Sequence, residues 1–356
     1  MTDGSDYEII RAPRVRFPEI SPRAYEHPAD KGALAGLRAV PGVSEVLKAA
    51  AGLFSERGER LMALASAIRV GEHQYPTLDK LRLECAATLD LPALPNVFVA
   101  RSAEANAFAI GMDQPFIVLT TDLVEALDTE ALRFVIGHEM GHILSGHAVL
   151  RTLLIRLIQL QASMSLVPIG ALGLRAVIAA LREWFRKAEL TCDRAGLLCG
   201  QDAPAALRAH VYLAGATDLS QIDIPSFLRQ AEEYEQTEDI RDSIHKFRNV
   251  ELMTHPLAVV RAAQLQRWSA STEYRQILSG DYPRRGDEDP GSTFMDDMRG
   301  AARSYRDSAT QSTDPLLKVL SDVGAGVSDA AGRLFRGFTG GNGGNNGGEQ
   351  PDTDKN

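Results

Sequence analysis

Cysteine is scarce in this sequence of 356 residues, and positive charge is in deficit. The three cysteines, Cys85, Cys192 and Cys199, are an odd and sparse set, which fits a reducing compartment better than a disulfide framework. The formal net charge is -9, and no long run of lysine or arginine offsets it. Because nucleic-acid binding relies on basic surface that neutralises phosphates, we expect no nucleic-acid partner.

Long apolar runs are also missing. Residues 1–17 carry charges where a signal peptide needs an uninterrupted apolar core, so we expect a cytoplasmic protein. Residues 157–174 are uncharged and come near the lower limit for crossing a bilayer. Two glutamines, two serines and Pro168 interrupt them. An apolar helical hairpin over 148–181, soluble or serving as an oligomer contact, is therefore the favoured interpretation, with membrane attachment as the alternative.

The composition divides the chain into four parts. Residues 1–40 are polar and contain four spaced prolines, which predicts an extended N-terminal arm. Residues 41–275 form the expected folded domain. Residues 276–340 begin as a linker rich in proline, glycine and charge and end in an amphipathic helix. That helix either packs on the protein's own surface or docks, through 313–340, on a partner or membrane. Residues 341–356 are rich in glycine and asparagine and should be disordered.

Within the folded domain, apolar residues recur at helical spacing over 44–70, and a second helix is expected over 77–89. Three short apolar segments bounded by turn residues follow, at 96–100, 105–110 and 115–120. Gly111–Gln114 lies between the last two and predicts a hairpin connection. The expected fold class is α+β, mostly helical with a small, largely antiparallel sheet.

The central motif is His138-Glu139-Met140-Gly141-His142. Thr121 and Asp128 are expected to cap two successive helices, the second carrying this motif. Residues four apart lie on one face of a helix, so both imidazoles can reach one zinc ion. Glu139 would then lie beside the attacking water and take its proton.

A zinc hydrolase needs a third protein ligand and an open fourth position. The long metzincin pattern fails, because Ser145 and Ala148 occupy the places where it requires glycine and histidine. The other option is a glutamate on a second helix, which Glu189 supplies, with Asp193 four residues later on the same face. Asp193 can accept a hydrogen bond from a ligand histidine and so fix its tautomer.

With these motifs in place, the sequence resembles the gluzincin peptidases of the CAAX prenyl protease and HtpX kind over about residues 40–270. The motif His138–His142 is followed by Ser145-Gly-His147, and Glu189-Leu-Thr-Cys-Asp193 resembles the glutamate helix of that family. Thr254-His255-Pro256, with Arg261 beyond it, matches the late histidine and arginine, and Asn106-Ala-Phe108 resembles the edge-strand motif.

The resemblance implies a zincin-type domain in which the HExxH helix packs on the glutamate helix. It implies that His255 stabilises the oxyanion, that Arg261 pairs with a carboxylate in the site, and that Asn106 and Phe108 lie on an edge strand where an extended peptide adds. A prenyl-protein substrate is not expected, because the chain lacks clear spanning helices. The other histidines, His147 and His210 among them, are expected to be structural or solvated.

These observations predict a zinc-dependent endopeptidase that hydrolyses extended or unfolded protein segments and binds one Zn²⁺ per chain. The zinc ligands would be His138, His142 and Glu189, and Glu139 would be the general base. The rival hypothesis is a zinc-stabilised binding or assembly module with latent or no peptidase activity, motivated by the apolar segment 148–181 and the C-terminal helix.

Overall fold

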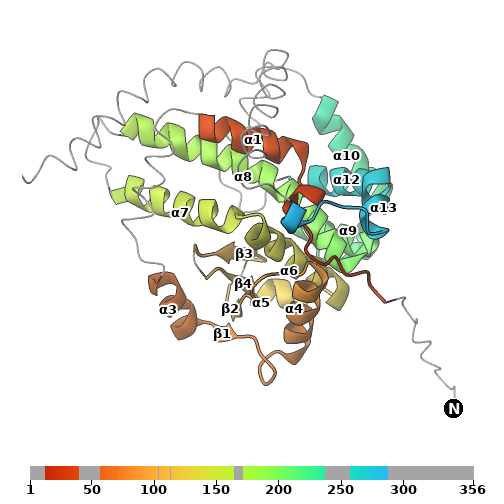
Figure 1. The fold of residues 1–356 in the computed structure, drawn as a ribbon, viewed down its shortest axis with the longest axis horizontal. Helices are drawn as coiled ribbons and strands as arrows, with labels where there is room; N and C mark the ends of the chain where they lie inside the picture. The colour runs from red at the N-terminus through yellow and green to blue at the C-terminus, as the bar shows by residue number, and fades with distance from the viewer. Residues whose placement is uncertain are drawn as a thin grey trace, which may run out of the picture.

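The computed structural model describes residues 13–39, 57–102, 104–112, 114–163, 171–236 and 257–287. This part of the chain is mostly helical, with one four-stranded sheet (Figure 1). The expected α+β class with a small sheet is confirmed. The predicted C-terminal amphipathic helix and the tail after it lie outside the described residues, as does most of the predicted linker.

The described helices take these bounds: α1 Pro28–Ala39, α3 Arg57–Ser66, α4 Pro76–Thr88, α5 Thr121–Ala126, α6 Thr129–Leu144, α7 His147–Ser163, α8 Ala171–Gly200, α9 Ala203–Leu213, α10 Ile224–Gln236, α12 Ala258–Ser269 and α13 Thr272–Leu278. The strands are β1 Ile68–Arg69, β2 Val97–Ala100, β3 Ala107–Ile110 and β4 Phe116–Thr120. The helix expected over 77–89 and the hairpin through Gly111–Gln114 are both present.

The sheet has the strand order β1-β2-β4-β3, which places β3 at one edge. Two of its three pairings are antiparallel, β1 with β2 and β3 with β4, and β2 runs parallel to β4. Side chains alternate between its two faces, as strand geometry requires. Ala107 and Ala109 of β3 join the main core, whereas Phe108 and Ile110 face a smaller apolar cluster with Phe98.

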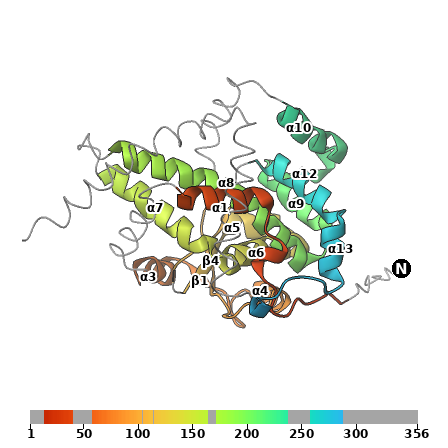
Figure 2. The same ribbon diagram turned by 45° about the horizontal axis from the view of Figure 1, so that its top comes forward.

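Helix α6 lies at the centre of the molecule, and every residue from Ala131 to His142 is buried. It packs against α8 along its length, with α4 and α9 on other sides. Helices α1 and α7 both pack along α8, and α9, α12 and α13 gather at the opposite end of the molecule from α7 (Figures 1 and 2). No helix among the described segments has the length and apolarity to cross a bilayer.

The N-terminal region differs from the predicted extended arm. Residues 28–39 form α1, because Pro28 occupies the first helical position, where its missing N–H costs nothing. The Nδ1 atom of His27 accepts a hydrogen bond from the backbone N–H of Ala29, at 3.1 Å, and so caps the helix. Before it, Phe17 and Ile20 are fully buried in the main core.

Two boundaries also differ. Ile68 was expected at the end of a helix but lies in β1, since α3 ends at Ser66 and the chain turns to pair with β2; residues 44–56 lie outside the described part. Helix α5 begins at Thr121, so the capping position falls on Thr120, whose side chain makes no capping bond. The cap predicted at Asp128 is confirmed.

Candidate metal centre

The histidines of the central motif come from a helix with a well-defined start. The Asp128 carboxylate accepts hydrogen bonds from the backbone N–H groups of Glu130 and Ala131, both at 3.0 Å, which satisfies two donors of the first turn of α6. One helical turn separates His138 from His142, and their Nε2 atoms lie 3.2 Å apart. Both imidazoles are buried.

Helix α8 approaches α6 closely because the facing residues are small. A Cβ atom on Gly141 would lie 2.6 Å from Cβ of Ala195, and one on Gly196 would lie 2.7 Å from the carbonyl oxygen of Phe134. This approach brings Glu189 to the two histidines. Its carboxylate oxygens lie 3.6 Å from Nε2 of His138 and 3.2 Å from Nε2 of His142.

A buried ionic network surrounds Asp193. Its carboxylate lies 3.0 Å from Nδ1 of His138, and Arg261 donates to it from Nε at 2.8 Å and Nη2 at 2.6 Å. Arg261 also reaches Glu189, with Nη1 2.7 Å from Oε2, and His210 Nε2 lies 3.3 Å from Asp193. Burial would raise the pKa of Asp193, but the charges of Arg261 and His210 hold that pKa well below its usual range.

The same surroundings shift the pKa values of His138 and His142 in opposite directions. Burial lowers the pKa of His142 to about 4, in spite of the opposing effect of Glu189. Burial also acts to lower the pKa of His138, but hydrogen bonds with Asp193 and Glu189 outweigh it and raise that pKa to about 9. A metal ion binding at His138 therefore displaces a proton, as is usual for imidazole ligands.

The burial of the Glu139 carboxylate is the feature of the site that most needs an explanation. Its side chain is fully buried, and neither carboxylate oxygen has a hydrogen-bond partner among the described residues. Oε1 lies 4.0 Å from Nε2 of His138. The carboxylate lines a pocket whose other walls are mainly apolar, formed by Ala107, Leu123, Phe134, Val135, His138, Leu213 and Arg261. A buried carboxylate without partners is costly, and a cation with its water beside it would remove that cost.

The residues present fit a zinc ion. One potential ligand atom from each of His138, His142 and Glu189 lies within 4.8 Å of the others, and all three side chains are buried. Two imidazoles and one carboxylate are a donor set that zinc takes in hydrolytic sites. The other nitrogen of His138 faces Asp193, as a hydrogen-bonded ligand histidine requires.

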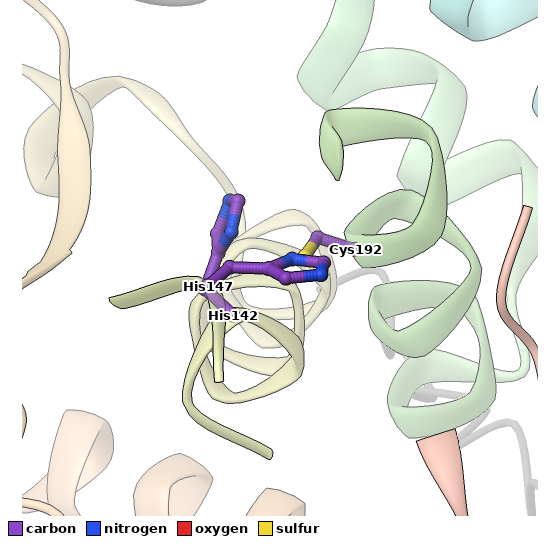
Figure 3. Close-up of side chains that lie close together, drawn as sticks. All are labelled: His142, His147 and Cys192. Carbon is purple, nitrogen blue, oxygen red and sulfur yellow. The ribbon is translucent and has the colours of Figure 1, made fainter. Parts of the chain in front are cut away.

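A second group of possible ligands lies on the other side of His142 and consists of His142, His147 and Cys192 (Figure 3). Cys192 projects from α8 toward the two imidazoles, and its Sγ lies 3.4 Å from Nδ1 of His147. Burial and the nearby Glu189 raise the pKa of Cys192 well above its usual range. The thiol is thus neutral in the metal-free protein, although a metal ion deprotonates a thiol that binds it. The buried carboxylate of Glu139 lies beside His138 of the first group, which makes the first group the stronger candidate for a hydrolytic zinc.

His147 connects this second group to the N-terminal helix. Its Nε2 atom lies 3.2 Å from Oδ2 of Asp30 on α1, and the same oxygen accepts a hydrogen bond from Thr191 on α8 at 2.6 Å. Asp30 is fully buried. Polar contacts thus connect Cys192, through His147, with Asp30 on α1.

The candidate substrate strand lies beside the centre. Strand β3 is an edge of the sheet, and Asn106 precedes it, with its backbone N–H donating to Oγ1 of Thr120 at 2.8 Å. The ring of Phe108 is partly buried, and the guanidinium carbon of Arg151 lies 5.5 Å from its centroid. Phe185 of α8 stacks on His142, with centroids 5.4 Å apart and an interplanar angle of 11°.

The structure brings eight of the predicted site residues to this region: Asn106, Phe108, His138, Glu139, His142, Glu189, Asp193 and Arg261. Thr254, His255 and Pro256 lie outside the described residues, so the role of His255 stays a prediction. No local pattern indicated a role for Asp30, which lies before the region that resembles the family. His147 and His210 were expected to be structural or solvated; both are buried and face carboxylates.

The fold and the centre are those of an HExxH metallopeptidase. Comparison with protein families gives the same class, since residues 72–269 match the model of Peptidase family M48. The chain belongs to this family, and it is thus a metal-dependent peptidase. No solved structure matches it significantly.

Curated relatives agree. The chain is 34% identical over 277 residues to "Plastoglobule-localized metallopeptidase 48, chloroplastic" of Arabidopsis thaliana, a match that covers 76% of this chain and 79% of the relative. It is 34% identical over 101 residues to a "Protease HtpX homolog" of Thermoanaerobacter pseudethanolicus, covering 28% and 33% of the two chains. It is 30% identical over 145 residues to "Metalloendopeptidase OMA1, mitochondrial" of Homo sapiens, covering 36% and 27%.

Proposed function

We propose that this chain is a zinc-dependent endopeptidase that cleaves extended or unfolded segments of proteins, with zinc held by His138, His142 and Glu189. The observation that carries the proposal is the buried carboxylate of Glu139, which lies beside these three side chains and has no hydrogen-bond partner among the described residues. A purely structural zinc site has no use for such a group. The printed names of the HtpX and OMA1 relatives, a protease and a metalloendopeptidase, support cleavage of protein chains.

Each residue then has a role in hydrolysis. Zinc held by these residues would act as a Lewis acid, which polarises the scissile carbonyl and lowers the pKa of the attacking water. Glu139 accepts the proton of that water and returns it to the leaving amine. Asp193 holds His138 in the tautomer whose Nε2 faces the centre, and Arg261 balances the charge of Asp193 and Glu189. The predicted oxyanion donor is His255.

The substrate would add to the free edge of β3 as a further strand. Among the described strands β3 pairs with β4 alone, so no strand lies along its other edge. An extended segment pairs with that edge by backbone hydrogen bonds, which give affinity without fixing the sequence. We assign Asn106 and Phe108 to this contact, because they lie at the start of β3 and on it.

The test is cleavage of an unfolded protein such as casein by the zinc-loaded protein and by Glu139→Gln. We expect the variant to keep its zinc and to lose activity by about 10²- to 10⁴-fold, the usual contribution of a general base. Glu125→Gln, at an exposed position on α5, is the matched control and should cleave like the wild type. Zinc analysis of Glu189→Ala completes the experiment, with the expected loss of one zinc per chain.

Two results would contradict the proposal. Full activity in Glu139→Gln would remove the assigned base, and full zinc occupancy in Glu189→Ala would remove the assigned ligand. Zinc binding by a wild type that cleaves no unfolded protein would favour the alternative, a zinc-stabilised binding module.

A further inference from the structure

All but one of the buried arginines in the described part of the chain form an ion pair with a carboxylate. Five are at least nine-tenths buried. Four of them pair with carboxylates: Arg133 with Glu84 and Glu130, Arg156 with Glu59, Arg194 with Glu273, and Arg261 with Asp193 and Glu189. The fifth is Arg151 on α7, and no carboxylate of the described residues lies within ion-pair distance of it.

The guanidinium of Arg151 lies between two aromatic rings instead. Its central carbon is 4.8 Å from the centroid of Phe185 and 5.5 Å from that of Phe108. Cation–π contacts of this kind offset part of the cost of burying a charge. Such contacts do not engage the N–H donors, and Nη1 is buried without a hydrogen-bond partner among the described residues. Because arginine stays charged at every physiological pH, an anion is the missing partner.

The place of Arg151 indicates where that anion comes from. Phe108 belongs to β3, the sheet edge assigned to the substrate, and Phe185 stacks on His142 of the candidate metal centre. The guanidinium thus lies between the strand where a peptide adds and a ligand of the metal. Arg151 keeps 9% of its residue surface exposed, against 1% to 8% for the other four, so part of the residue contacts solvent.

We propose that Arg151 binds a carboxylate of the peptide substrate, which makes it a specificity-determining residue for acidic peptides; this rests on the proposed function. A planar guanidinium and a carboxylate form two parallel hydrogen bonds, a geometry that a neutral amide does not match. The carboxylate belongs either to an acidic side chain or to the C-terminus of the peptide, and the two sources are separable by experiment.

The experiment measures peptide binding without turnover. Zinc-loaded Glu139→Gln is titrated against fluorescent, otherwise neutral peptides in which one glutamate is moved along the sequence, beside glutamine twins. Each peptide is made with a free and with an amidated C-terminus. At one position, or at the free C-terminus, we expect the carboxylate form to bind about 10- to 100-fold more tightly, the range for a hydrogen bond to a charged group.

A second substitution in the Glu139→Gln background tests whether Arg151 causes that preference. Arg151→Met keeps an apolar side chain between the two rings and should bring the affinity ratio close to one. Arg151→Lys keeps the charge but not the fork, so it should retain part of the ratio and serves if the methionine variant does not fold. Arg175→Met removes the same charge from an exposed position of α8 and should leave the ratio unchanged.

Equal binding of acid and amide forms at every position and both termini would overturn the proposal. So would a preference that survives Arg151→Met, or the absence of binding by every peptide. Because binding is read without cleavage, failure of the casein test contradicts the endopeptidase and leaves this measurement intact.

Discussion

The close approach of α6 and α8 makes Gly141→Ala a quantitative test of how the centre is built. The added Cβ would lie 2.6 Å from Cβ of Ala195, where carbon atoms normally stay about 3.5 to 4.0 Å apart. Cβ of Ala195 is fixed to its helix and cannot rotate away. The two helices must therefore separate by about 1 Å at this point.

Such a separation matters more for the metal than for the fold. Glu189 and the two histidines come from different helices, and metal–ligand distances tolerate shifts of only about 0.2 Å. We expect zinc affinity to fall by about tenfold or more. The free energy of unfolding without zinc should fall by about 1 to 3 kcal/mol through overpacking, offset by up to about 1 kcal/mol because alanine favours helix over glycine.

Zinc affinity is measured by competition with a chromophoric chelator, and stability by denaturant unfolding in excess chelator. Gly58→Ala is the matched control, because a Cβ there meets nothing within 4 Å, and it should bind zinc like the wild type. Adding Ala195→Gly to Gly141→Ala removes the clashing atom and should restore most of the affinity. Wild-type affinity in Gly141→Ala, or no recovery in the double variant, would refute the reasoning.

Three further predictions concern single side chains. Asp193→Asn should lower zinc affinity by about 10- to 100-fold, because His138 loses its anionic partner, and unchanged chelator competition would contradict this. Cys192→Ala should keep one zinc per chain by metal analysis, and loss of zinc would instead identify the thiol as a ligand. Burial and the charge of Arg194 lower the pKa of His27 to about 4 from 6.5, so the unfolded chain takes up its proton first as the pH falls. The free energy of unfolding should then decrease by up to about 3 kcal/mol as the pH falls from 6.5 to 4. Chemical unfolding at several pH values should show a smaller decrease for His27→Asn, whose side chain can still accept the capping hydrogen bond. Equal pH dependence in both proteins would exclude His27 as the cause.

Local spacing predicted much of the centre. The four-residue interval between His138 and His142 fixes their common helix face whatever surrounds them. The same interval between Glu189 and Asp193 predicted that one would face the histidines and the other would lie beside it. The structure has both helices packed together with these groups in contact.

Contacts between distant segments could not be predicted in this way. The spacing of prolines suggested an extended arm, but Pro28 begins a helix, because a proline fits both the first helical turn and an extended chain. The contact of Asp30 with His147 joins residues far apart in sequence and leaves no local pattern. The isolation of Arg151 likewise depends on which carboxylates tertiary packing brings near, and no window of sequence contains that information.

The N-terminal segment changes what counts as the smallest active unit. The family match begins at residue 72, yet Phe17, Ile20 and Tyr25 are fully buried in the main core, and Asp30 contacts His147. A fragment trimmed to the matched range would open apolar surface and leave His147 without its carboxylate. The family match thus marks a shorter stretch than the one that folds, and any minimal version of this peptidase has to start upstream of Phe17.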